Sequence, residues 1–232
     1  MMKKYYPDED RQLVAVDCII FGFDAGMLKL LVVKRSFEPG KGRWSLAGGF
    51  LRKNESLDDC ASRVLLELTG LKEVYLEQLQ SYGDIARDEG DRVVSVAYYA
   101  LLNIKDHNLD LSSDNDAYWC PLDEMPDLIF DHGDMVGKAL KRLKRKVKIQ
   151  PVGFELLPGK FTLPQLQTLY ESIYQKDLDK RNFRKKILSM DLLDKLPEKD
   201  KSNSKKGAYF YSFNQKKYNE LVSDGFYFNL DV

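Results

Sequence analysis

The most constraining feature of the sequence is the stretch of residues 49–71, which predicts a glycine-containing loop followed by a helix with defined ends. Ser56 and Asp59 have the spacing of a capping box, in which each side chain bonds the backbone N–H of the other residue. The residues after them follow helical spacing as far as Thr69. Gly70 then supplies the left-handed conformation that commonly ends a helix. The sequence therefore predicts a helix from Ser56 to Thr69.

Apolar, β-branched runs and a second helical pattern surround this segment. Strands are predicted at residues 13–21, 28–34, 74–82, 93–102 and 118–121, with a hairpin turn at residues 24–26 joining the first two. The run 93–102 is apolar on both faces and is therefore expected inside the sheet. Residues 134–147 carry apolar side chains at helical spacing. Strands alternating with two helices predict an α/β sandwich in residues 1–149.

The composition changes near residue 150, where prolines and glycines in residues 150–160 indicate a domain junction. Helices are predicted over residues 163–174 and 180–190, and short strands over 192–196 and 208–213 flank a loop rich in Lys and Ser. A helix, a turn, a second helix and a hairpin follow one another in a winged helix-turn-helix. The prediction is an α+β chain with domains at residues 1–149 and 150–232.

Charge is distributed unevenly between the two halves. Residues 1–137 contain 15 Lys and Arg against 25 Asp and Glu, whereas residues 138–232 contain 21 against 11. An acidic body joined to a basic half is expected when one domain binds a polyanion. The alternative is that two domains simply differ in surface charge.

Three widely spaced cysteines, Cys18, Cys60 and Cys120, have no cluster of histidines near them in the sequence. They are interpreted as reduced thiols rather than as a disulfide framework or a zinc site. No apolar run approaches the ~18 residues that suggest a membrane helix. The start of the chain also lacks the apolar region of a signal peptide. These features predict a cytoplasmic protein that does not bind a membrane.

The segment 49–71 resembles the Nudix box. The glycines, charged residues and aliphatic residues of that pattern are matched in register by Gly49, Glu55, Arg63, Leu65, Glu67, Gly70 and Leu71. The resemblance implies a Nudix-type α/β/α sandwich over residues ~10–147. It also implies that Glu55 and Arg63 brace the loop against the helix.

Two positions of the box depart from the pattern. Active Nudix enzymes hold Mg²⁺ with glutamates at three helix positions that correspond here to Val64, Glu67 and Leu68. Hydrolysis of a pyrophosphate needs metal ions to neutralise charge and prepare a water nucleophile. Valine and leucine supply neither function, so no metal site and no catalytic residue are predicted. Weak binding of Mg²⁺ at Glu67 stays open, because this ion often takes only one or two carboxylates.

A fold that has lost its metal ligands can keep its cleft as a sensor of a small molecule. The candidate effector-binding residues are Asp17, Lys34, Arg35, Trp44, Arg87 and Arg92. A carboxylate such as Asp17 inside an apolar strand is costly unless it is paired or faces a ligand. Each candidate has an alternative: Asp17 could turn outward from an edge strand, Trp44 could belong to the core, and the cationic residues could be solvated.

The basic segment 180–187 is the candidate DNA-reading element. With Phe183 and Ile187 facing inward, the polar residues of the helix project outward, and the loop between the last strands adds two lysines. The candidate DNA-binding residues are Lys180, Arg181, Asn182, Arg184, Lys185, Lys186, Lys205 and Lys206. Arg181 and Asn182 suit purine edges, whereas the other cations would neutralise phosphates. Basic amphipathic helices are often only solvated surface, which is the alternative.

This half resembles the C-terminal domain of Nudix-related transcriptional regulators. The similarity is carried by FELLP at 154–158, FTL at 161–163, QLQ at 165–167, RNFRKK at 181–186 and the pair Asp131-His132. The resemblance implies a homodimer that binds double-stranded operator DNA under control of an effector. Some such regulators sense ADP-ribose and others sense sugars. The whole chain is most similar to the arabinose-responsive branch, which implies L-arabinose, a pentose, as the effector.

Two other functions are weighed against the regulator. One is a Mg²⁺-dependent Nudix hydrolase acting on ADP-ribose or a related nucleoside diphosphate derivative. The other is a Nudix scaffold that binds protein partners, with a basic face that is merely solvated. The regulator is preferred because it explains the uneven charge, the altered box and the pair of helices together.

Overall fold

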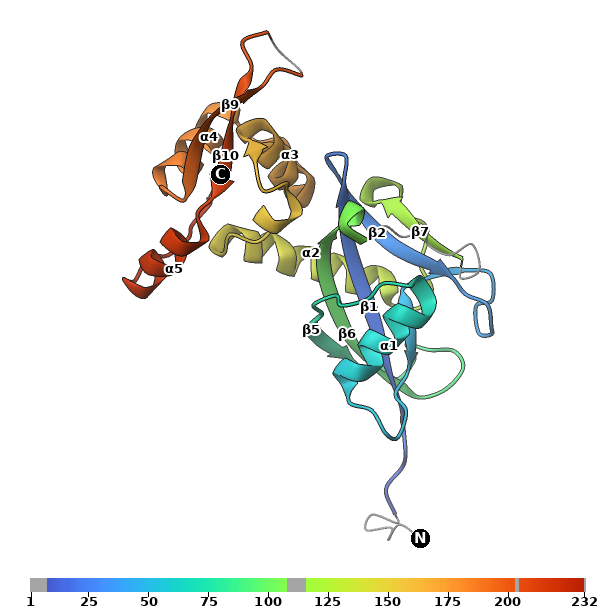
Figure 1. Ribbon diagram of the computed structural model, residues 1–232. Coiled ribbons are helices and arrows are strands. Elements are labelled where there is room, and N and C mark those ends of the chain that lie inside the picture. The colour runs from blue at the N-terminus through green and yellow to red at the C-terminus, as the bar shows by residue number, and fades with distance from the viewer. Residues whose placement is uncertain (1–7, 108–115, 203–204, 232) are drawn as a thin grey trace.

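The computed structural model describes residues 8–107, 116–202 and 205–231, which form two lobes that helix α2 connects (Figure 1). A Nudix fold followed by a C-terminal winged helix-turn-helix is the arrangement expected from the sequence. Within the described residues, no helix has both the length and the apolarity needed to cross a membrane.

The first lobe is built on one mixed sheet. Its strands are β1 (Leu13–Asp24), β2 (Met27–Lys34), β3 (Trp44–Ser45), β4 (Ala47–Phe50), β5 (Glu77–Tyr82), β6 (Val93–Asn103) and β7 (Ala117–Pro121). The main order is β3-β2-β1-β6-β5, with β4 paired to β1 and β7 paired to β2. β1 and β2 form the expected hairpin, and β6 lies inside the sheet, parallel to β1. The fifth strand begins at Glu77, three residues later than predicted.

Two helices cover opposite faces of the sheet: α1 (Leu57–Thr69) and α2 (His132–Ile149) (Figure 1). Neighbouring residues of a strand point to opposite faces. Cys18 and Ile20 of β1 therefore pack in the core beneath α1, while Ile19 and Phe21 pack in the core beneath α2. Because β1 is apolar on both faces, it becomes the centre of the sandwich. Short 3-10 turns at Ile104–His107, Leu122–Glu124 and Phe154–Leu156 (η1, η2 and η3) complete the connections.

The capping signals fix both ends of α1 as predicted. The Ser56 side chain accepts from the backbone N–H of Asp59, and the Asp59 carboxylate accepts from the N–H of Ser56. Gly70 has φ 78° and ends the helix in the left-handed region. The helix predicted over residues 134–147 is longer in the structure, since α2 begins at His132 and ends at Ile149.

The second lobe has the winged-helix order. Its elements are β8 (Phe161–Thr162), α3 (Leu163–Tyr174), α4 (Lys180–Ser189), β9 (Leu193–Asp200), β10 (Ala208–Phe213) and α5 (Gln215–Ser223). β9 runs past Pro197, where a loop was predicted. This proline is tolerated because β9 is an edge strand and the pairing shifts register between Tyr209 and Tyr211. Helix α5 was not predicted.

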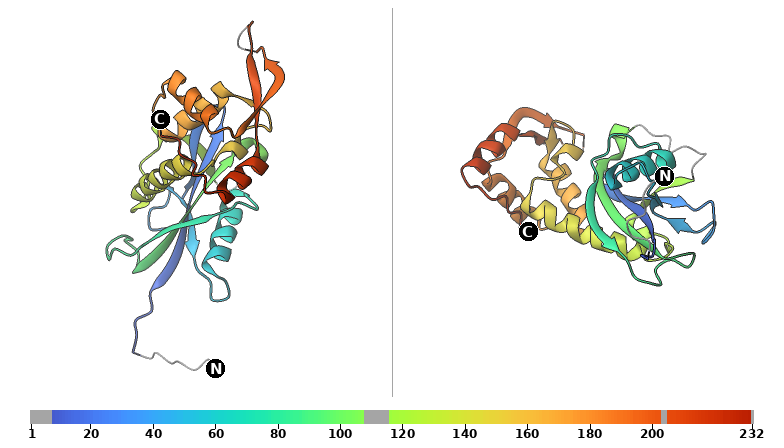
Figure 2. Two further views of the ribbon diagram at one scale, coloured as in Figure 1. Left: turned by 90° about the vertical axis from the view of Figure 1, so that its left-hand side faces the viewer. Right: turned by 90° about the horizontal axis from the view of Figure 1, so that it is seen from below.

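The end of the chain returns to α2 and joins the lobes (Figure 2). Phe228 and Leu230 are buried, and the Leu230 N–H donates to the Lys148 carbonyl at 2.9 Å. Lys148 also forms an ion pair with Asp231 at 2.9 Å. On the other side of the junction, the Asn103 amide donates to the Leu156 carbonyl at 3.0 Å. The two lobes therefore share one apolar core rather than hanging on a flexible linker.

Replacing Leu230 with alanine tests the contribution of this returning segment. Leu230 is fully buried, so Leu230→Ala is expected to lower the free energy of unfolding by about 2–5 kcal/mol. Tyr227→Ala is the matched control, because Tyr227 is 87% exposed and its loss should change the value by less than about 0.5 kcal/mol. Urea unfolding followed by circular dichroism measures both. Equal midpoints for the two variants would show that the segment does not hold the lobes together.

Candidate functional site

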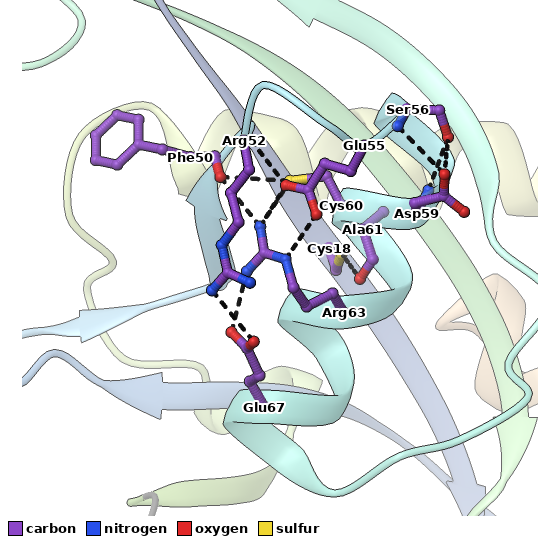
Figure 3. A network of polar contacts seen from close by, with 10 residues as sticks. All are labelled: Cys18, Phe50, Arg52, Glu55, Ser56, Asp59, Cys60, Ala61, Arg63 and Glu67. Atoms are coloured by element: carbon purple, nitrogen blue, oxygen red, sulfur yellow. Dashed lines mark hydrogen bonds and ion pairs between the residues drawn. The ribbon is translucent and has the colours of Figure 1, made fainter.

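Glu55 and Arg63 brace the loop against α1, as the sequence implied (Figure 3). Arg63 donates to both oxygens of Glu55, at 2.6 and 2.8 Å, and to the Phe50 carbonyl at 3.1 Å. Glu55 also accepts from the backbone N–H of Arg52 at 2.8 Å. The hydrogen bonds from Arg63 lower the pKa of Glu55 to about 2. The carboxylate is thus ionised and fully used in holding the loop.

The three positions that carry metal ligands in the box do not fit a cluster of Mg²⁺ ions. Val64 is buried directly below Gly49, where an added Cβ would lie 2.7 Å from a Val64 methyl group. Glu67 accepts from Arg63 at 3.0 Å and from Arg52 at 3.3 Å (Figure 3). Leu68 offers no oxygen. One carboxylate held by two guanidinium groups is a poor partner for a divalent cation, which prefers several oxygen ligands.

Asp59 does not extend this row of charges. Asp59, Arg63 and Glu67 lie four residues apart, a spacing at which opposite charges on a helix can pair. The structure shows the Arg63–Glu67 pair, but the Asp59 carboxylate accepts from the Ser56 hydroxyl at 2.7 Å instead. Capping therefore takes precedence over the ion pair at the start of α1.

A cavity of about 130 Å³ lies beside Leu68, where the missing carboxylate would stand. Lys34 and Arg35, both predicted as effector-binding residues, line it together with Phe37 and Gly48. Lys34 is exposed, and the Arg35 guanidinium lies 3.9 Å from the centre of the Phe37 ring. The cleft of the altered box therefore has apolar lining residues and two cations, against one carboxylate, Asp116, that also lines it. This excess of positive charge suits a ligand that carries negative charge.

Trp44 is half-buried, and its ring meets Tyr118 edge-on with centroids 5.3 Å apart. It packs against the core, which was the alternative to a role in effector binding. A role for Trp44 in contacting the effector stays a prediction.

Asp17 is buried and paired, so the alternative that it turns outward is wrong. Its carboxylate accepts from the Ser95 hydroxyl at 2.5 Å, and it lies 3.5 Å from His132 Nε2 and 3.7 Å from Arg87 Nη2. Arg87 in turn donates to both oxygens of Asp131, at 2.7 and 3.0 Å. These five residues form the buried polar cluster of the first lobe.

The two arginines of the loop 84–92 differ in their surroundings. Arg87 is 8% exposed, so its interpretation as a solvated loop residue is wrong. Its guanidinium faces carboxylates, and direct contact with an effector stays a prediction. Arg92 is half-buried and donates to the Asp84 carbonyl at 2.9 Å, which leaves it at the surface of the loop.

The buried polar cluster lies directly behind the wall of the cavity. Ser45, Leu46 and Gly48 line the cavity, and the Leu46 N–H donates to His132 Nδ1 at 3.1 Å. A Cβ on Gly48 would lie 2.2 Å from an Asp17 oxygen, so only glycine allows this approach. Sequence reasoning missed Ser95 and the roles of Asp131 and His132. A serine inside the apolar run 93–102 was the available signal.

Histidine 132 is neutral in this arrangement. Nδ1 accepts from a backbone N–H, so the ring proton lies on Nε2, facing Asp17. Burial lowers the pKa of His132, and the nearby Arg87 acts in the same direction against the two aspartates. The charged form is therefore disfavoured in the folded protein.

Helix α4 presents a basic surface above a buried apolar face. The Asp179 side chain accepts from the Asn182 N–H at 2.8 Å and caps the helix. Phe183 and Ile187 are buried, whereas Lys180, Arg181, Asn182 and Lys185 are exposed. Arg184 and Lys186 are half-buried. Lys205 and Lys206 are exposed at the end of the β9–β10 hairpin.

Comparisons with known proteins match both lobes. Residues 11–139 match the NUDIX domain family, and residues 153–213 match the NrtR DNA-binding winged helix domain. The chain belongs to the NrtR family. The expected division at residue 149 falls between the two matched regions and stays a prediction.

Relatives of this NrtR-family chain cover most of its length. The ADPR responsive transcriptional repressor NtrR of Acinetobacter baylyi is 36% identical over 215 residues, which are 91% of this chain and 84% of that protein. Shewanella oneidensis NrtR complexed with a 27mer DNA is 32% identical with a TM-score of 0.74, covering 94% of this chain and 99% of that one.

Two further relatives match the first lobe alone. The NUDIX domain of Shewanella oneidensis NrtR complexed with ADP ribose is 36% identical with a TM-score of 0.53, covering 60% of this chain and 94% of that one. An ADP-ribose pyrophosphatase of Methanocaldococcus jannaschii is 32% identical over 124 residues, 53% of this chain and 70% of that protein.

The lowered pKa of His132 predicts how stability depends on pH. Above its ordinary pKa of about 6.5 the imidazole is neutral in both the folded and the unfolded chain. As the pH falls below that value, the unfolded chain binds a proton that the folded chain resists, so the free energy of unfolding should fall. Thermal unfolding between pH 7.5 and 5 measures the effect.

Substitution of each histidine separates this effect from other titrations. His132→Gln should reduce the slope of stability against pH in this range, although it weakens the fold at pH 7.5. His107→Gln, which removes the other histidine of the chain, should leave the slope intact. A slope that survives in the first variant would assign the pH dependence to other groups.

Proposed function

We propose that this chain is a transcriptional repressor that binds operator DNA through α4 and the β9–β10 hairpin, with an affinity set by ADP-ribose in the NUDIX domain. The observation that carries the proposal is the pairing of an altered NUDIX cleft with an exposed basic helix. Lys180, Arg181 and Lys185 are the exposed cations of α4. Phe183 and Ile187 anchor their helix. The relative bound to a 27mer DNA supports the same use of this lobe.

ADP-ribose is a better supported effector than arabinose. The Acinetobacter relative is named for its response to ADPR, and a relative of the first lobe has been crystallised with ADP ribose. None of the relatives reported above supports the pentose that the resemblance implied. Lys34 and Arg35 at the cavity would attract a diphosphate. A cavity of about 130 Å³ is below the ~300–1,000 Å³ of typical ligand sites, so it must open to take the whole molecule.

We propose that the first lobe binds its effector without hydrolysing it. The single carboxylate Glu67 is held by Arg52 and Arg63, which leaves no set of oxygens for the metal ions that cleave a pyrophosphate. The pyrophosphatase relative favours the hydrolase as the second candidate. Turnover in the presence of Mg²⁺ distinguishes the two.

Calorimetry with ADP-ribose tests the effector. Binding is expected for ADP-ribose and not for L-arabinose, with no release of AMP above background when Mg²⁺ is added. Arg35→Gln should weaken binding about 10- to 150-fold, since a hydrogen bond to a charged group contributes about 1.5–3 kcal/mol. Lys138→Gln, which removes an exposed cation from α2 on the opposite face of the sheet, is the control. Turnover that disappears in Glu67→Ala would establish the hydrolase instead.

Binding of the DNA upstream of the gene tests the recognition helix. Arg181→Ala should cost about 1–3 kcal/mol and relax sequence preference if it reads a base, whereas Lys185→Ala should weaken all sequences alike. Lys216→Ala on α5 is the control. Fluorescence anisotropy with operator and scrambled duplexes measures both effects. If neither variant of α4 differs from the control, α4 does not bind DNA.

We also propose a homodimer on the operator. Two recognition helices one helical turn of DNA apart would make the operator a palindrome, and an effector could alter their spacing. The stoichiometry in the same titration should then be two chains per duplex.

A further inference from the structure

A second cavity of the described residues lies at the junction of the two lobes, apart from the NUDIX cleft. Its volume is about 720 Å³. The β1–β2 turn lines one side of it, and η3, α3, α4 and the β9–β10 hairpin line the others. It shares no lining residue with the smaller cavity beside Leu68. The two cavities are therefore separate sites.

The junction cavity has apolar walls and three cationic side chains. Leu156, Leu157 and Pro158 form part of the apolar wall, while Lys105, Lys180 and Arg184 bring positive charge. Ligand sites in proteins have volumes of about 300–1,000 Å³ and combine such walls with a few convergent polar groups.

The two acidic residues of the cavity are already engaged. Asp24 forms ion pairs with Lys29 at 3.1 Å and with Lys105 at 3.8 Å, and Asp200 accepts from the Ser202 N–H at 2.9 Å. Neither is paired with Lys180 or Arg184. Positive charge on the α4 side of the cavity is thus not balanced by these acids.

Arg184 is the most informative residue of this cavity. Its Nε is buried and has no hydrogen-bond partner among the described residues. Buried donors in native proteins are nearly always satisfied by protein, water or a ligand, and the described residues supply no partner for this one. Arg184 also forms no ion pair with any residue that the structure describes. Its planar guanidinium matches the oxygens of a phosphate or carboxylate.

The spacing along α4 separates two groups of cations. Lys180 and Arg184 are four residues apart and both line the junction cavity, whereas Arg181 and Lys185 do not. Residues at this spacing lie on the same side of a helix. The side of α4 that faces the first lobe is therefore distinct from the one that Arg181 and Lys185 offer to DNA.

We propose that the junction cavity is a binding site for a small organic anion that carries a phosphate or carboxylate group, with Arg184 as its principal ligand and Lys180 and Lys105 in support. The apolar walls would cover the uncharged part of that molecule. This site would be a second input to the repressor, independent of the effector in the NUDIX domain.

Such a ligand would act on the arrangement of the lobes, because it would contact both. The turn residue Gly26 approaches Thr168 of α3 so closely that a Cβ would lie 3.0 Å from its methyl group. A molecule seated between this turn and α4 favours whichever arrangement gives it more contacts. Occupancy of the site then changes the affinity of α4 for DNA.

Calorimetry of the full chain with inorganic pyrophosphate, at constant ionic strength, tests the proposal. Arg184→Met keeps most of the side chain's apolar length but removes the guanidinium, and it should weaken binding at least tenfold. Lys185→Met on the same helix is the matched control and should bind as the wild type does, whereas Arg35→Gln reports any pyrophosphate that the NUDIX cleft holds. Pyrophosphate should raise the melting temperature of the wild type more than that of Arg184→Met.

A purely structural role for Arg184 makes the opposite prediction for the protein without ligand. If Arg184 stabilises the fold, Arg184→Met should melt lower; if it awaits an anion, loss of the unpaired donor should leave the melting temperature unchanged or raise it. A lower melting temperature overturns the proposal. So does wild-type protein that fails to bind pyrophosphate, or binding that is lost in Arg35→Gln instead. If Arg184→Met weakens only DNA binding, the guanidinium holds a DNA phosphate and the cavity is not a separate site.

Discussion

The pairing of the buried Asp17 carboxylate is the interaction on which the rest of the first lobe depends. β1 lies at the centre of the sheet and pairs with β2, β4 and β6, so a charge on it has no access to water. A buried carboxylate is tolerated only when it is hydrogen-bonded and paired. Ser95 supplies the hydrogen bond, while Arg87 and His132 supply the facing groups. The contacts that pair this buried carboxylate thereby hold the loop with Arg87 and the start of α2 against the sheet.

Helix α2 is held at both of its ends as a consequence. At the first turn of α2, His132 lies against Asp17 and accepts from the Leu46 N–H. Asp131 accepts from Arg87 with both carboxylate oxygens and does not cap the helix. At its last turn the Lys148 carbonyl accepts from Leu230. Helix α2 therefore links the cleft beside Leu68 to the second lobe. Since the wall of the cleft carries Leu46 and Gly48, widening of the cleft would displace the groups that hold the first turn of α2.

Local signals made most of the fold predictable from the sequence. The capping box at Ser56 and Asp59, the turn at residues 24–26 and the apolar spacing of α2 and α4 each act within a few residues, so a single sequence displays them. The partners of Asp17 lie 70 or more positions away, and nothing local marks Arg87 as buried. For the same reason the strand predicted at residues 192–196 was too short, because the continuation of β9 past Pro197 depends on the register shift of its partner strand.

Contacts between distant residues also explain why the sequence alone could not separate the cations of α4 into two groups. Their spacing shows that Phe183 and Ile187 face inward, and it places every other polar residue outside. The junction cavity divides that outer surface, because Lys180 and Arg184 line it together with the β1–β2 turn and η3, while Arg181 and Lys185 do not. If α4 binds DNA and the junction binds an anion as proposed, one basic helix would contact both. The position of the lobes, rather than the composition of the helix, would then decide which cations reach DNA.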